Sequence, residues 1–217
     1  MKFYNSLSSL KFSWDQVASG FWRRYPNPHS SHVLTEDTVE RNVEGKKLFS
    51  TRLISKTNKI PKWGEKIIPG GTKIVCVVEE SVVDVEKKTL TTYTRNIGLT
   101  KFMTIEEKVV YRQDPENKNQ TICERQAWIT SNLFGFSYAI QAFGFERFKK
   151  NAHKAIHGFE HVLNKMYLPE IPEASRGKAM NITKDKLKEK AKAATELAKQ
   201  KAAVYATCSP STGHSAS

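Results

Sequence analysis

FGFSYAIQAFGFERFKKNAHKAIHGFEHVLNKM, residues 134–166, is the stretch of sequence that decides the fold. It contains no proline, and its apolar residues recur every three or four positions, which places them on one face of a helix. At 1.5 Å per residue this helix is about 50 Å long. The apolar face comprises Phe136, Ile140, Phe143, Phe145, Phe148, Ala152, Ala155, Ile156, Phe159, Val162, Leu163 and Met166. The opposite face carries Arg147, Lys150, His153, Lys154, His157 and His161.

So long an apolar face needs a broad apolar partner, and the sequence before it predicts a sheet. Seven segments have the composition or two-residue period of strands, namely residues 3–12, 32–43, 47–57, 72–84, 87–97, 101–111 and 121–131. Their short connections require antiparallel neighbours. We therefore predict an α+β fold with a seven-stranded antiparallel sheet against one long C-terminal helix. The residues alone leave open whether the sheet closes over the helix or leaves a ligand cavity.

A short helix is predicted between the first two strands. Ser13 and Gln16 have the spacing of a capping box, and Trp14, Val17 and Phe21 recur on one side. Prolines at positions 26 and 28 end this helix.

The charge of the chain indicates an anionic partner. The 217 residues carry a formal net charge of +13, which favours nucleic acid, a membrane surface or an anionic small molecule. Cys76, Cys123 and Cys208 are odd in number and far apart, so they predict neither a disulfide framework nor a metal pair. No apolar run approaches the roughly 18 residues of a membrane span. The N-terminus resembles neither a signal peptide nor an Arg-rich transit peptide, so any import into an organelle would have to use another route.

The composition changes after residue 168. Pro169 and Pro172 indicate a linker, and residues 176–201 hold nine Lys or Arg and three Asp or Glu, a local charge of +6. This Lys/Ala-rich segment favours a marginal amphipathic helix, and the last residues favour disorder. We predict one domain over residues 1–168, followed by a linker, tail and disordered C-terminus over 169–217.

No catalytic constellation is recognisable in the sequence. The chain lacks a nucleophile elbow, a P-loop, a dinucleotide fingerprint and a zinc-binding HExxH motif. The row of His153, His157 and His161 is compatible with a metal or a pH-sensitive patch, but the neighbouring lysines disfavour a cation and favour a solvated or anion-facing surface. Glu79 and Glu80 point to opposite faces of a strand and cannot form a dyad. We expect neither enzyme activity, a metal nor a cofactor.

Basic residues from three separate segments offer a binding site for an anion, although scattered solubilising charge explains them equally well. These segments lack the interleaved aromatic residues that stack bases, and no nucleic-acid motif is present. A phosphate-headed lipid is therefore favoured over nucleic acid.

FWRRYPNPHSSHVLTEDTVERNV, residues 21–43, resembles the N-terminal signature of the PRELI-like family of mitochondrial lipid-transfer proteins. TRLISKTNKIPKW (51–63), TYTRNI (92–97), ICERQAW (122–128) and the Phe-rich final helix match that family in the same order. The resemblance covers about residues 1–168. The Lys/Ala-rich tail is similar to that of the PRELI branch of the family.

The resemblance implies a curved seven-stranded sheet wrapped around the long helix and enclosing a lipid cavity. It implies transfer of phosphatidic acid from the outer to the inner mitochondrial membrane across the intermembrane space, for cardiolipin synthesis. It also implies docking on anionic membrane surfaces and a heterodimer with a small intermembrane-space chaperone that carries twin cysteine motifs. The alternatives are a phosphatidylserine carrier of the same fold, and a basic nucleic-acid or scaffold protein that acts through its tail.

The resemblance also assigns residues to the site. The basic positions expected at the lipid headgroup are Arg24, His32, Lys56, Lys59, Arg147 and Lys154. Residues 59–69 resemble a lid loop over the cavity, with Ile60, Lys62, Trp63, Lys66, Ile67 and Ile68 touching the membrane; a short helix packed on the sheet is the alternative for this loop. From the apolar face of the long helix, we expect Phe145, Phe148, Ile156 and Phe159 to line the cavity.

Overall fold

The computed structural model describes residues 1–58, 61, 64 and 74–168. Its strands are β1 (Lys2–Leu10), β2 (Val33–Glu44), β3 (Lys47–Thr57), β4 (Ile74–Asp84), β5 (Thr89–Asn96), β6 (Thr104–Gln113) and β7 (Thr121–Thr130). The helices are α1 (Trp14–Gly20), the 3₁₀ turns η1 (Phe21–Arg23) and η2 (Pro28–Ser30), and α3 (Ser137–Tyr167). The predicted tail over 169–217 and the predicted lid residues Lys59, Ile60, Lys62, Trp63, Lys66, Ile67 and Ile68 lie outside the described residues.

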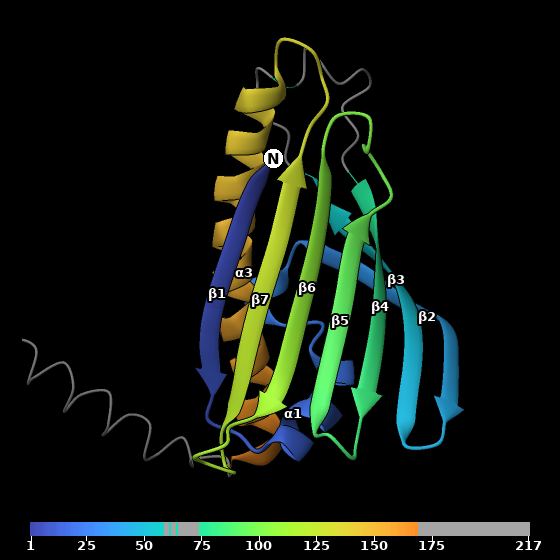
Figure 1. The fold of residues 1–217 in the computed structure, drawn as a ribbon, viewed down its shortest axis with the longest axis vertical. Helices are drawn as coiled ribbons and strands as arrows, with labels where there is room; N and C mark the ends of the chain where they lie inside the picture. Colours follow the sequence, from blue (N-terminus) through green and yellow to red (C-terminus); the bar gives the residue numbers. More distant parts are fainter. Residues whose placement is uncertain (59–60, 62–63, 65–73, 169–217) are drawn as a thin grey trace, which may run out of the picture. The chain divides into compact units, whose positions relative to one another are not determined.

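One antiparallel sheet contains all seven described strands, in the order β1-β7-β6-β5-β4-β3-β2. Strands β2 to β7 form a meander, and β1 pairs with β7 along its whole length (Figure 1). The α+β fold and the strand count predicted from the sequence are confirmed.

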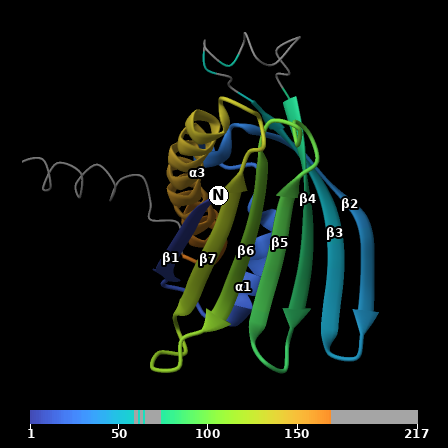
Figure 2. The ribbon, with the colours of Figure 1, turned by 45° about the horizontal axis from the view of Figure 1, so that its top comes forward.

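Helix α3 runs along one face of the sheet, and the sheet curves past it (Figure 2). The helix packs mainly against β1 and β7, while the inner faces of β3 to β5 extend beyond it. This one-sided packing separates the middle of the sheet from the helix and leaves room for a cavity.

Two apolar clusters hold the helix to the sheet. The cluster nearer the start of α3, which we call the upper cluster, contains Tyr4, Ala127, Ile129 and Ala152. The cluster nearer the end of α3, the lower cluster, is centred on Phe21, Leu90, Phe159 and Leu163. Burial of these side chains stabilises the fold at about 25 cal/mol per Å² of apolar surface. The two clusters lie at different levels along α3, and polar residues occupy the sheet between them.

Helix α1 belongs to the lower cluster, and it begins as its sequence predicts. The Ser13 hydroxyl accepts from the Gln16 backbone N–H, and the Gln16 side chain accepts from the Ser13 backbone N–H at 3.0 Å, which completes the capping box. Trp14 and Val17 are buried, and the Trp14 indole donates to the Tyr111 carbonyl at 3.3 Å.

Among the described helices, none combines the length and hydropathy that a membrane crossing requires.

Candidate functional site

A cavity of about 270 Å³ lies between α3 and the inner faces of β3 to β6. Most of its wall is apolar, with Ile54, Val77, Ile105, Phe143, Phe148 and Phe159 among its lining residues. Several small residues of α3 face this space, including Gly144 and Ala155. A Cβ on Gly144 would lie 2.3 Å from the Met103 sulfur, so a larger residue here would displace the flexible Met103 side chain from the cavity wall.

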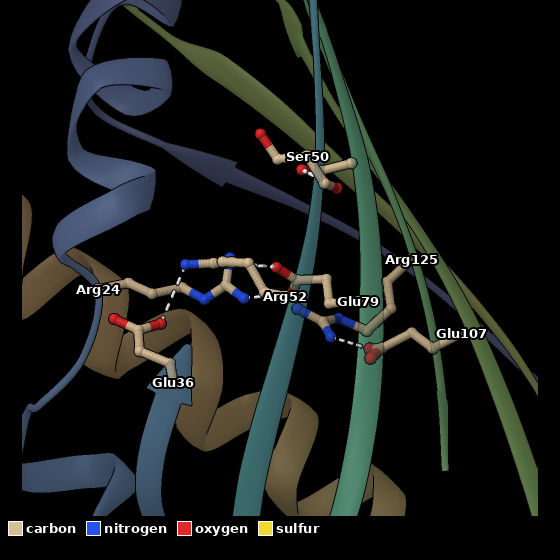
Figure 3. A network of polar contacts seen from close by, with 8 residues as sticks. Arg24, Glu36, Ser50, Arg52, Glu79, Glu107 and Arg125 are labelled. Carbon is tan, nitrogen blue, oxygen red and sulfur yellow. Dashed lines mark hydrogen bonds and ion pairs between the residues drawn. The ribbon is translucent and has the colours of Figure 1, made fainter. Parts of the chain in front are cut away.

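A belt of polar side chains crosses the inner face of the sheet (Figure 3). The strand register aligns Arg52 with Glu79, Glu79 with Thr94, and Thr94 with Glu107. A second row aligns Ser50 with Ser81 and Thr92. We call the charged members of this region, Arg24, Glu36, Arg52, Glu79, Glu107 and Arg125, the polar belt.

Every charged member of the polar belt forms at least one ion pair with another member. Glu79 accepts from Arg24 and from Arg52, and the Arg52 Nε–Glu79 Oε1 distance is 3.1 Å. Arg52 Nη1 also donates to Glu36 Oε2 at 3.0 Å. Arg125 pairs separately with Glu107. The three guanidinium groups therefore face three carboxylates, and the belt is electrically balanced.

Burial and ion pairing act in opposite directions on the pKa values of the belt. Burial disfavours the charged form of Glu79, but Arg24 and Arg52 hold the pKa of its carboxyl below the ordinary value. Burial likewise opposes the charge of Arg24, yet the Glu79 carboxylate raises the Arg24 pKa. For Glu36, burial dominates over Arg52 and raises the carboxyl pKa. Glu79 and Arg24 consequently remain a charged pair, so neither group is suited to exchange a proton at neutral pH.

The segment before β2 fixes Arg24 in the belt. The Arg24 guanidinium lies 4.0 Å from the Phe21 ring centroid, in the geometry of a cation–π contact. Asn27 Nδ2 donates to the Arg24 carbonyl at 2.7 Å, and Asn27 Oδ1 accepts from the His29 backbone N–H at 3.0 Å. These contacts hold Arg24 at the floor of the cavity.

A second group of basic residues lies at the edge of the cavity, where the end of β3 meets α3. We call Lys56, Arg147 and Lys154 the edge cations; the neutral ring of His32 lies among them. The Thr57 N–H donates to the His32 carbonyl at 2.8 Å, and Arg147 Nη1 donates to Asn58 Oδ1 at 3.0 Å. Burial and then the charges of Lys56, Lys154 and Arg147 lower the pKa of His32 to about 4.

Two of the edge cations, Lys56 and Lys154, have no carboxylate partner among the described residues. The charged groups that shift the His32 pKa are all cations. Arg147 is half-buried, and this burial lowers the pKa of its guanidinium. An anion that enters this corner therefore gains attraction without first displacing an internal carboxylate of the polar belt.

The expected headgroup residues occupy different places. Arg24, His32, Lys56 and Arg147 all line the cavity, Arg24 in the polar belt and the other three at the edge. Lys154 is exposed and lies outside the lining, although its charge acts on His32. Lys59 lies outside the described residues.

The expected cavity-lining residues also divide into two groups. Phe148 and Phe159 line the cavity. Phe145 instead faces β1, with its ring centroid 6.1 Å from that of Tyr4, and Ile156 packs on the lower cluster. Each follows a small residue that does face the cavity, Gly144 or Ala155, and one step along a helix turns a side chain by about 100°. Of the predicted lid, the described residues Pro61 and Gly64 line the cavity.

The polar belt was not anticipated from the sequence, although a signal for it exists. Arg52 lies two residues before the inward Ile54, and Glu79 lies two residues after the inward Val77. Because side chains alternate across a strand, a charge in phase with buried apolar positions must point inward. In each strand, charged residues that alternate in step with the buried apolar residues identify the belt. Which of these charges pair with one another depends on the register of the strands.

The histidine row of α3 gains a neighbour from η2. The ring of His29 lies 6.3 Å from that of His157 and 6.1 Å from that of His161, and all three residues are exposed. Within the described part of the chain, no group of three or more His, Cys, Asp or Glu side chains has a metal-binding arrangement.

The chemistry of the cavity fits binding better than catalysis. Cys123 is buried and does not line the cavity, and burial raises the pKa of its thiol, which disfavours the nucleophilic thiolate. Burial also raises the pKa of Tyr111. The carboxylates that line the cavity, Glu79 and Glu107, are each bound by an arginine.

Comparison with known proteins gives a consistent family and fold. The model of the PRELI-like family matches residues 15–168. The chain is 48% identical to "PRELI domain-containing protein 1, mitochondrial" of Gallus gallus over 200 residues, covering 91% of this chain and 87% of the relative. It is 45% identical to the Homo sapiens protein of the same name, with 87% of each chain covered.

A solved structure with a similar fold is the Zhui aromatase/cyclase from Streptomyces sp. R1128. Its TM-score is 0.53 at 7% identity, covering 77% of this chain and 96% of the other. At this identity the likeness concerns the fold alone, a curved sheet that grips a long helix.

Proposed function

Because the chain belongs to the PRELI-like family, we propose that it carries phosphatidic acid from the outer to the inner mitochondrial membrane, for cardiolipin synthesis. The relatives reported above carry the word mitochondrial in their names, which supports this location. The proposed route crosses the intermembrane space. The observation that carries the proposal is an apolar cavity with basic side chains gathered at one edge, where Lys56, Lys154 and Arg147 all act on His32.

Acyl chains make the apolar wall necessary. Each methylene contributes about 0.8 kcal/mol, so two chains oppose leaving a bilayer by on the order of 20 kcal/mol. A carrier must therefore replace the bilayer with apolar contacts. The wall formed by Ile54, Val77, Phe143 and Phe148 supplies such contacts. The cavity volume of about 270 Å³ is close to the lower limit of ligand-pocket volumes, about 300 Å³.

The headgroup phosphate is assigned to the edge cations rather than to the polar belt. A phosphate placed beside Arg24 adds negative charge to a balanced and buried network, and such a charge is strongly disfavoured in a medium of low dielectric. The same phosphate beside Lys56 meets a cation that pairs with no carboxylate among the described residues, and Arg147 also lines the cavity there. Arg147 can bind two phosphate oxygens at once, whereas Lys56 acts as a point charge. In this proposal Arg24 shapes the floor of the cavity and does not bind the headgroup.

The remaining parts of the proposal concern partners. We propose docking on anionic membrane surfaces, with the lid segment 59–69 in contact with lipid, and a heterodimer with a small chaperone that carries twin cysteine motifs. No covalent step is proposed. Loading and release are shifts between conformations that bind the membrane and the partner differently.

Lipid transfer between donor and acceptor liposomes tests the proposal. Phosphatidic acid, phosphatidylserine and phosphatidylcholine labelled with a fluorophore are run in parallel, with and without the chaperone partner. Selective transfer of phosphatidic acid is the expected result. Selective transfer of phosphatidylserine would instead support the alternative function, a phosphatidylserine carrier of the same fold. If the folded, monodisperse complex transfers none of the three lipids, the carrier proposal is wrong.

A nucleic-acid or scaffold function through the tail is the second candidate, supported by the local charge of +6 over residues 176–201. It requires duplex binding that falls steeply with salt and disappears when the tail is removed. The carrier requires transfer that persists without the tail.

A further inference from the structure

The loop between β7 and α3 presents aromatic side chains to solvent. Phe134 is 98% exposed, Tyr138 78% and Phe136 50%. Residues 126–145, which span this loop, contain no charged side chain. Single exposed apolar residues are common, but three aromatic residues within five positions form a patch that water solvates poorly.

Hydrogen bonds within the loop satisfy part of its backbone. Ser137 Oγ donates to the Ser131 carbonyl at 2.6 Å, and Gln141 Nε2 donates to the same carbonyl at 3.3 Å. The Phe136 N–H donates to the Leu133 carbonyl at 3.2 Å. Gly135 has a φ of +77°, which glycine adopts without strain. A loop whose backbone groups are bonded internally can enter an apolar phase with a smaller desolvation penalty.

The exposed loop lies at one end of the cavity. Ile140 and Phe143, in the first two turns of α3, line the cavity directly after the loop. Leu99 and Phe102 of the β5–β6 loop line it at the same end. Figures 1 and 2 both show the β5–β6 and β7–α3 loops at the same end of the sheet. A membrane that touches the loop is therefore next to the cavity.

The charges around the loop favour an anionic surface. Lys2 Nζ lies 5.4 Å from the Tyr138 ring centroid, and Lys101 is exposed in the β5–β6 loop. Residues 97–103 and 132–139 contain no acidic residue, and neither does the first turn of α3. Aromatic rings beside lysines are typical of side chains at the membrane–water interface.

We propose that Phe134, Phe136 and Tyr138 insert into the interface of an anionic phospholipid bilayer and dock the cavity on the membrane. This contact is additional to the one proposed for the lid segment. It rests on the proposed function in so far as docking serves lipid exchange, but the contact itself is measurable without any cargo.

Flotation of the full-length protein with vesicles of phosphatidylcholine and phosphatidylglycerol tests the contact. Phe134→Ser is expected to weaken vesicle binding about tenfold, because one aromatic side chain no longer leaves water. Tyr138→Ser should act in the same direction, and Phe134→Leu should restore most of the binding. Val43→Ser is the matched control, because Val43 is 67% exposed near the β2–β3 turn, at the opposite end of the sheet.

Native mass spectrometry and the melting temperature distinguish a wrong membrane contact from a wrong proposed function and from misfolding of the variant. Native mass spectrometry with a short-chain phosphatidic acid, in the absence of vesicles, reports on the cavity alone. Absence of that complex in the wild type would contradict the proposed function, and the flotation result would still decide the contact. Phe134→Ser should keep the short-chain complex and the wild-type melting temperature. Vesicle binding equal to the wild type in both serine variants would overturn the contact, and so would self-association in solution that only Phe134→Ser abolishes.

Discussion

At the scale of single residues, charge balance distinguishes Lys56 from Arg24 even though both line the cavity. Lys56 forms no ion pair with a described carboxylate, whereas Arg24 faces Glu79 in a neutral network. The two residues should therefore fail in different ways when they are replaced.

Lys56→Ala should reduce the transfer of anionic lipid about tenfold, the effect of losing one hydrogen bond to a charged group. The unfolding free energy should change little, because Lys56 forms no described ion pair. Liposome transfer measures the first quantity and urea denaturation the second. Lys108→Ala is the control, since Lys108 lies over Tyr93, which is on the outer face of the sheet. Full activity of Lys56→Ala would contradict the assignment of the phosphate.

Arg24→Ala should lower the unfolding free energy by about 3 kcal/mol, because it leaves the buried Glu79 carboxylate with one partner fewer. Arg23→Ala is a matched control one residue away, and its exposed side chain should contribute less than about 0.5 kcal/mol. Urea denaturation of both variants gives the comparison. Equal stability of the two would show that the polar belt does not hold Arg24 as described.

His32 provides a pH-dependent test of the edge cations. Its pKa is lowered from 6.5 to about 4, so the neutral ring is favoured in the folded protein. The resulting stability is complete above pH 6.5 and is lost as the pH falls towards 4. An NMR titration of the ring should show the low pKa. Removing a nearby positive charge with Lys56→Ala, or adding phosphatidic acid, should raise it. A pKa that responds to neither change would remove His32 from the anion site.

At the scale of elements, the close approach of η2 to α3 fixes the chain segment that carries Arg24. A Cβ on Gly158 would lie 2.4 Å from Asn27 Oδ1. Asn27 is buried and bonded to both the Arg24 carbonyl and the His29 N–H, so it has little freedom to move aside. The spacing between η2 and α3 therefore depends on this glycine.

Gly158→Ala should consequently destabilise the protein by about 2 kcal/mol, although alanine favours a helix more than glycine does. The melting temperature measured by circular dichroism gives the result. Gly98→Ala is the control, because its added Cβ meets its nearest neighbour at an ordinary 3.5 Å. A stabilised Gly158→Ala variant would mean that α3 and η2 separate easily.

At the scale of the whole molecule, the family match ends at residue 168, where the composition changes to the Lys/Ala-rich tail. The tail segment 176–201 accounts for +6 of the +13 net charge and leaves +7 for the rest of the chain. Charge that contributes to membrane attraction is screened by salt, whereas an apolar cavity is not.

A chain that ends at Leu168 should therefore retain selective lipid transfer, with weaker attraction to anionic vesicles at low salt. Transfer assays at two salt concentrations, on the full and shortened chains, measure both effects. A shortened chain that is folded but transfers no lipid would place an essential part of the carrier in the tail.

The sequence alone determined the class of the fold. The three-to-four-residue period of α3, the two-residue period of the strands and the short connections specify one helix on an antiparallel sheet, because these patterns are local. The capping box of α1 is local in the same sense. The resemblance of residues 21–43 to the PRELI-like family is also a property of the sequence, and it assigns His32, Lys56 and Arg147 to one expected headgroup site.

Only the tertiary structure decided which charges meet. The pairing of Arg24 with Glu79 joins residues 55 positions apart, and that of Arg125 with Glu107 depends on the register of β6 and β7. The turn of about 100° between Gly144 and Phe145 likewise decided which of the two faces the cavity. Such contacts depend on how whole elements pack, and a periodic pattern in the sequence does not specify the rotation or the register of one element against another.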